Sequence, residues 1–182
     1  MKIGVSSLYY AKMLDEVAET YETPRALAGL SSIGSSASNT NLKFYADNTL
    51  FISNMYVGEL EISIEIAELS AEEIADLLGM TADTEDVVTS KLSDVAPYVA
   101  LGYKELDHNG AETFVWLLKG KFQVMDETIT TKGKTPEAQP LSMVGNFIGK
   151  DNGVFRIKSD SSIPGYKDVS STWFTQATIE SV

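Results

Sequence analysis

The stretch that decides the fold is Glu59-Leu60-Glu61-Ile62-Ser63-Ile64-Glu65-Ile66-Ala67. Apolar and polar residues alternate strictly along it. The apolar set is Leu60, Ile62, Ile64 and Ile66, and the polar set is Glu59, Glu61, Ser63 and Glu65. A period of two is typical of a β-strand with one face in the core and the other in water. We therefore expect a strand whose outer face is acidic.

A short helix is predicted directly after this strand. Ser70 and Glu73 have the spacing of a capping box, in which each side chain satisfies the other residue's free backbone amide. Apolar residues at positions 74, 77 and 78 form one stripe, and Gly79 can end the helix in a left-handed conformation.

Two Asn-Gly pairs lie between apolar runs and predict two β-hairpins. Asn109-Gly110 would join residues 97–103 to 113–118, and Asn152-Gly153 would join residues 143–148 to 154–158. The run 113–118 is apolar on both faces. Such a strand is either sandwiched between two layers or covered by another subunit.

The N-terminal third predicts a strand at residues 8–11, either a strand or a loose arm at residues 26–39, and a long loop at residues 40–57. The loop carries several aromatic residues, which argue against disorder and favour burial against a partner. The candidate residues for a subunit or ring interface are Phe44, Tyr45, Asp47, Phe51, Met55 and Tyr56, together with Trp116 of the doubly apolar strand.

Taken together, these elements predict a mainly β protein. We expect a β-sandwich or barrel with one flanking α-helix and extended loops or arms. The length of 182 residues suits one domain. Residues 1–160 would form that domain, and residues 161–182 a C-terminal tail or docking segment of it, with a short helix or docking tail at residues 168–178.

The composition is that of an ordinary globular protein, with 43% hydrophobic and 22% charged residues. The absence of cysteine excludes disulfides and thiolate chemistry. The N-terminal residues do not have the pattern of a signal peptide, and no apolar run approaches the length of a membrane span. We expect a soluble protein that is made in the cytoplasm and has no membrane partner.

Charge is distributed unevenly in a chain whose formal net charge is −12. Residues 59–94 hold eleven acidic residues and one basic residue, whereas residues 119–158 hold seven basic and four acidic residues. Two interpretations remain open: a solvated surface, or head-to-tail attraction between identical subunits. The overall negative charge argues against tight binding of nucleic acid.

The residues needed for catalysis or metal binding do not occur in suitable groups. His108 is the only histidine and falls in a predicted turn, and one histidine without cysteine cannot form a zinc site. Gly133-Lys134-Thr135 resembles the end of a phosphate-binding loop but lacks its first glycine and is followed by Pro136. We expect no enzyme activity, no cofactor and no metal.

Several segments in order resemble the major tail protein family of bacteriophages with long non-contractile tails. They are residues 8–11, Pro24 with 27–29, 45–47, 58–61 with 67–69, 94–103, 114–116 with 119–122, and 132–134 with Pro136. The resemblance covers roughly residues 8 to 160. It implies a β-sandwich subunit with a flanking helix that forms hexameric rings, which stack into a hollow tail tube.

The same resemblance implies the partners and the location. The partners would be copies of the chain, the tape-measure protein and the tail-end proteins of the virion, and DNA would pass through the bore without specific binding. As a separate hypothesis, we place Glu59, Glu61 and Glu65 on the wall of that bore, where their charges would repel DNA phosphates. The alternative is a monomeric β-sandwich module that binds carbohydrate or decorates a virion.

Overall fold

The computed structural model describes residues 1–46, 49–83, 85, 87–124 and 140–182. The strands are β1 (Lys2–Asp15), β2 (Thr20–Tyr21), β3 (Arg25–Leu27), β4 (Leu30–Ala46), β5 (Thr49–Ile66), β6 (Thr81–Ala82), β7 (Val88–Thr89), β8 (Val99–Asp107), β9 (Glu112–Phe122), β10 (Leu141–Ile148) and β11 (Arg156–Asp160). The helices are α1 (Ala71–Leu78) and α2 (Gln176–Glu180). The protein is mainly β, as the sequence predicts.

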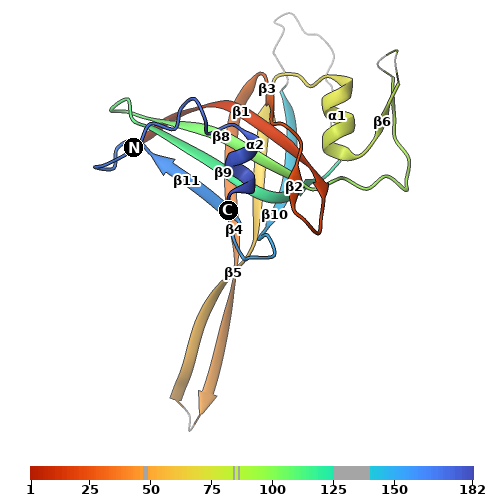
Figure 1. Ribbon diagram of the computed structural model, residues 1–182. Helices are drawn as coiled ribbons and strands as arrows, with labels where there is room; N and C mark the ends of the chain where they lie inside the picture. Colours follow the sequence, from red (N-terminus) through yellow and green to blue (C-terminus); the bar gives the residue numbers. More distant parts are fainter. Residues whose placement is uncertain (47–48, 84, 86, 125–139) are drawn as a thin grey trace, which may run out of the picture.

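One large antiparallel sheet forms the body, with the strand order β2-β1-β8-β9-β10-β5-β4. The two ends of this path approach each other, because β3 pairs with β1 and leads directly into β4. The sheet therefore curves around a core, and α1 lies beside it (Figure 1). Sequence-distant strands thus become neighbours, as in sandwich-like folds.

Two apolar clusters lie on opposite faces of the central strands. The inner core contains Ile62, Ile64, Leu101 and Leu117 among others, and α1 contributes Leu77 to it. The outer core contains Phe114, Trp116 and Leu118 of β9 and is covered by the C-terminal segment through Trp173 and Ile179. Successive residues of β9 point alternately into the two cores. Of the two explanations for its doubly apolar sequence, sandwiching between layers is the one observed.

The strand and helix signals around residue 60 are confirmed. Within β5, the four alternating apolar residues of 60–66 are buried and the polar residues between them are exposed. The Ser70 side chain accepts a hydrogen bond from the Glu73 amide, the reciprocal bond is present, and Gly79 has a left-handed φ of 70°.

Helix α1 is anchored to the sheet by one carboxylate. Asp76 accepts hydrogen bonds from the Tyr10 hydroxyl at 3.0 Å and from Lys12 at 2.9 Å, and Arg25 lies 3.2 Å from it. Burial, followed by the Asp76 charge, raises the pKa of Tyr10 well above its ordinary value. The flanking helix is thus fixed to β1 and β3.

The first predicted hairpin is present and the second is not. Strands β8 and β9 pair across the turn at Asn109-Gly110. Strands β10 and β11 do not pair with each other: both pair antiparallel with the same edge of β9, one after the other. The intervening turn is closed by a bond from the Lys150 amide to the Val154 carbonyl at 2.9 Å. An Asn-Gly pair specifies a local turn, but it does not determine which strand the chain pairs with after the turn.

Residues 40–57 were expected to be a long loop, and that expectation is wrong. The described part of this stretch continues β4 and β5 as a two-stranded ribbon, which projects from the body in Figure 1. Polar residues such as Asn41 and Asn54 interrupt the apolar alternation and hide the strand pattern. These residues form strands because the backbones of β4 and β5 pair with each other, although the side-chain pattern does not indicate it.

The C-terminal segment packs against the body. Helix α2 occupies Gln176–Glu180, within and just beyond the stretch where a helix or docking tail was expected. Its Glu180 accepts a hydrogen bond from the Tyr21 amide at 2.9 Å, and its Gln176 donates one to the Tyr21 carbonyl at 2.7 Å. These side chains satisfy the β2 backbone as a neighbouring strand would. The segment 132–134 with Pro136, which belongs to the family resemblance, lies outside the described residues.

Candidate assembly surface

The most distinctive surface of the molecule is the outer part of the β4–β5 hairpin, residues 38–46 and 49–59, which we call the arm. Strand β10 pairs with β5 only from Leu60 to Ile66, so in the described part of the chain the arm strands pair only with each other. The arm leaves the body as a single ribbon (Figure 1). An isolated two-stranded ribbon is only marginally stable in water.

Large apolar side chains lie exposed along the arm. Their exposed fractions are 54% for Leu42, 62% for Tyr45, 72% for Phe51, 70% for Met55 and 56% for Val57. No other described strand pairs along the outer edges of the arm. Such edges pair readily with other chains, and exposed apolar patches of this kind mark interaction sites.

The structure brings most of the predicted interface residues together on the arm. Tyr45, Phe51 and Met55 are exposed there. The backbones of Phe44 and Tyr56 belong to the same ribbon, where they pair with Ile52 and Thr40. Asp47 lies outside the described residues.

Trp116 does not belong to this surface, and its assignment to a subunit interface is corrected. Its side chain is fully buried in the outer core, and its indole N–H donates to the Trp173 carbonyl at 2.8 Å. Phe174 contacts the indole edge-on, with ring centroids 5.8 Å apart. The C-terminal segment supplies within one chain the cover that was expected from a neighbouring subunit.

The predicted acidic face is present at the base of the arm. Glu59, Glu61 and Glu65 are exposed. Small polar residues surround them on the neighbouring strands: Glu61 lies opposite Ser36 of β4 and Asn146 of β10. Among the described contacts, Ser32 donates a hydrogen bond to Glu65 at 2.9 Å. This part of the sheet surface is therefore polar and negatively charged.

The basic region of residues 119–158 offers less positive surface charge than its sequence suggests. Lys119 is buried and donates to Glu19 at 2.8 Å. The bond to Glu19 raises the pKa of Lys119 and keeps it charged. Lys150 is also buried and donates to the Val182 carbonyl. Two of the lysines that could attract an acidic neighbouring subunit are therefore buried and hydrogen-bonded within their own chain.

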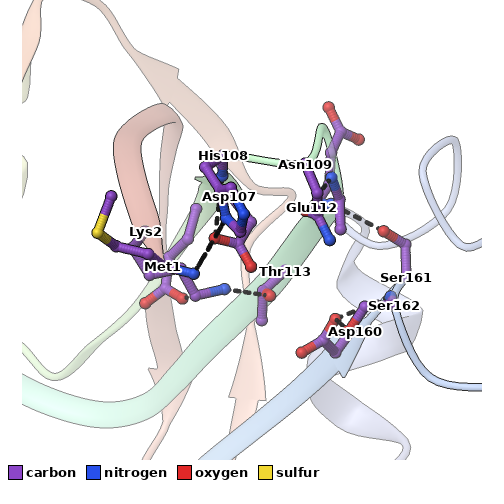
Figure 2. Close-up of polar contacts among 12 residues, drawn as sticks. Met1, Lys2, Asp107, His108, Asn109, Glu112, Thr113, Asp160, Ser161 and Ser162 are labelled. Carbon is purple, nitrogen blue, oxygen red and sulfur yellow. Dashed lines mark hydrogen bonds and ion pairs between the residues drawn. The ribbon is translucent and has the colours of Figure 1, made fainter.

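The only histidine lies where a turn was predicted. Figure 2 shows His108 at the β8–β9 turn, beside Asp107 and Met1. Its Nδ1 is 3.2 Å from the Asp107 carboxylate and 3.3 Å from the Met1 amino group. Within the described residues, no three His, Cys, Asp or Glu side chains are grouped so as to hold a metal ion.

Comparison with known proteins provides no assignment: no family model matches the chain, and no curated protein matches it significantly. Among the helices that the structure describes, none is both long and apolar enough to cross a membrane.

Sequence reasoning identified the residues of the arm but not its shape. It also missed a second feature, the open seam between the N-terminal halves of β1 and β4. A cavity of about 310 Å³ lies there, lined by Lys2, Gly4, Val5, Glu105 and residues 31–33. Neither feature has a local sequence signal, because each depends on which strands remain unpaired after the sheet has formed.

Proposed function

We propose that this chain is the subunit of a self-assembling structural polymer, the tail tube of a long-tailed bacteriophage with a non-contractile tail. The observation that carries the proposal is the arm. A folded body with two covered cores extends a ribbon whose apolar side chains contact water. Burial of that surface by other copies would stabilise the ribbon by roughly 25 cal/mol per Å² of apolar area.

The projecting arm supports a contact between copies of the chain. An arm that binds a different surface of its neighbour makes a heterologous contact, and repeated heterologous contacts generate rings or open helical assemblies. The sequence resemblance adds six subunits per ring and the stacking of rings into a tube. The tape-measure and tail-end proteins of the virion would then be the other partners, and the virion tail the location.

Under this proposal the acidic face of β5 lines the bore. Glu59, Glu61 and Glu65 would repel the DNA phosphates, so that the genome slides without binding. Replacing all three with Gln should leave tube formation intact but slow DNA passage or lower infectivity. Normal DNA ejection by this triple variant would contradict the assignment to the bore.

The proposal is tested by negative-stain electron microscopy of the purified protein at high concentration. We expect rings or tubes of uniform diameter. Compact single particles at every concentration would contradict the proposal and favour the alternative, a monomeric module that binds carbohydrate. Binding to capsids without self-assembly would instead indicate a decoration protein.

A further inference from the structure

The methionines of this chain differ widely in their access to solvent. The chain has six, of which Met125 lies outside the described residues. Met13 and Met143 are buried in the outer and inner core, with exposed fractions of 7% and 0%. Met55 is 70% exposed on the arm, and Met1 is 81% exposed. An oxidant dissolved in water therefore reaches the sulfurs of Met55 and Met1 before the two buried sulfurs.

Met55 belongs to the surface that the proposed assembly would bury. Met55 and Val57 lie on the same face of β5, because they are two residues apart within one register, and Val57 is 56% exposed. Neither residue belongs to a core cluster. A change in polarity at Met55 would thus act on contacts between copies and not on the folding of the body.

The other accessible methionine sulfurs of the described residues lie on the body. Met1 is at the N-terminus, where its amino group contacts the Asp107 carboxylate, away from the arm (Figure 1). Met80 follows α1 and is half-buried, and its sulfur accepts a hydrogen bond from the Ser90 hydroxyl at 3.1 Å. Within the described part of the chain, Met55 is therefore the one methionine whose sulfur lies on the arm.

From this distribution we infer that Met55 is a site of oxidative modification that controls assembly, with hydrogen peroxide as the oxidant. The thioether sulfur attacks one oxygen of the peroxide and the O–O bond breaks. The sulfur keeps that oxygen as a sulfoxide and the other oxygen leaves as water, so that two electrons pass from the sulfur to the peroxide. The reaction converts a flexible apolar side chain into a polar one.

The modification acts on the free subunit and not on the polymer. In the free subunit Met55 contacts water, whereas copies of the chain would cover it after assembly and exclude the oxidant. A sulfoxide oxygen that is buried in an apolar contact without a hydrogen-bond donor is unfavourable. Oxidised subunits therefore stay out of the assembly. This inference rests on the proposed function and adds a chemical condition under which subunits assemble.

Limited oxidation of the full chain tests the inference. Dilute subunits are treated with hydrogen peroxide, the peroxide is removed, and the sulfoxide at each methionine is quantified by peptide mass spectrometry. Light scattering then measures the concentration at which assembly begins. The matched control is Met55→Leu, which keeps an apolar side chain of similar volume but cannot be oxidised. A second variant, Met55→Gln, places a polar side chain of similar length there without any oxidant.

We expect Met55 to be oxidised faster than Met13 and Met143, and the oxidised subunits to need a several-fold higher concentration to assemble. Met55→Leu should assemble equally well before and after treatment, although Met1 is oxidised in it as well. Met55→Gln should assemble as poorly as the oxidised protein, with an unchanged melting temperature. Peroxide added to assembled protein should leave Met55 unmodified.

Three results would overturn the inference. Normal assembly of subunits that carry the Met55 sulfoxide would do so and would leave the proposed function intact. An equal loss of assembly in oxidised Met55→Leu would also do so, because the effect would then come from another residue. A chain that never assembles, whether oxidised or not, would overturn both the inference and the proposed function.

Discussion

At the scale of single residues, the outer core depends on how Trp116 is held. Its indole N–H donates to the Trp173 carbonyl, whereas the indole N–H of Trp173 is buried with no partner among the described residues. A buried donor without a partner costs about 1–3 kcal/mol. The two tryptophans therefore contribute to stability in different ways, although both contact the same cluster.

This difference predicts unequal costs for one substitution at two positions. Trp116→Phe removes a hydrogen bond and leaves a buried carbonyl unpaired, so we expect a loss of about 2–4 kcal/mol in the free energy of unfolding. Trp173→Phe also leaves a cavity, but it removes a buried donor that has no partner among the described residues. The loss in the free energy of unfolding should therefore be smaller for Trp173→Phe than for Trp116→Phe. Denaturant unfolding of both variants measures the difference, and a smaller loss for Trp116→Phe would contradict this account.

Gly102 gives a second prediction about the same indole. A methyl group on Gly102 would lie 2.8 Å from the Trp116 ring, which cannot move because it is fully buried and hydrogen-bonded. We expect Gly102→Ala to destabilise the subunit by about 1–3 kcal/mol through overpacking. The matched control is Gly4→Ala, also in a strand, where the nearest heavy atom would lie 4.0 Å away. Similar melting temperatures for the two variants would show that the indole can move.

Buried tyrosines predict how stability changes at alkaline pH. Burial raises the pKa of Tyr103 from 10.0 to about 12, and it raises the pKa values of Tyr10 and Tyr21 well above their ordinary value. The folded state favours the neutral phenol, so this contribution to stability is complete below pH 10 and is lost as the pH rises from 10 towards 12. Chemical unfolding at a series of pH values should show this decline. Unchanged stability across that interval would contradict the burial of these hydroxyls.

At the scale of elements, the arm should be separable from the body. Among the arm side chains that the structure describes, none belongs to either core cluster, and the first described buried residue of β5 is Leu60. We expect that replacing residues 40–56 with a short Asn-Gly turn leaves the melting temperature within a few degrees of the original. The same variant should lose assembly in light scattering. Assembly at the original concentration would contradict the role of the arm.

The sequence predicted the elements that have strong local signals. It failed where pairing with strands distant in the sequence determines the structure. The alternation at residues 59–67, the capping box at Ser70 and the Asn109-Gly110 hairpin are short-range patterns, and all three are confirmed. The strand pairing predicted across Asn152-Gly153 and the loop predicted at residues 40–57 were wrong, because pairing with β9 and within the β4–β5 hairpin is set by long-range contacts.

The candidate site shows the same division between local and long-range information. Exposed aromatic residues of the arm were identified from composition, and the acidic face from alternation. The cover over Trp116 was not identified, because the C-terminal segment that provides it lies 57 residues further along the chain. An apolar strand has the same sequence whether its cover comes from its own chain or from a partner.

At the scale of the whole molecule, the net charge of −12 should oppose assembly. Buried lysines such as Lys119 are already paired within the subunit, so repulsion between acidic bodies should exceed attraction. We expect the critical concentration for assembly to fall as salt rises, because the Debye length shortens from about 30 Å at 0.01 M to about 8 Å at 0.15 M. Light scattering at salt concentrations between about 0.01 M and about 0.15 M measures the critical concentration. Assembly that weakens with salt would instead support head-to-tail charge attraction between subunits.

The central claim is that copies of this chain cover the arm, and amide hydrogen exchange in the arm tests it most directly. In dilute subunits the amides of residues 38–46 and 49–59 should exchange rapidly, since only the two arm strands protect each other. In concentrated, assembled protein the same amides should become strongly protected, while those in the β8–β9 core change little. Arm amides that exchange equally fast in both samples would contradict the claim.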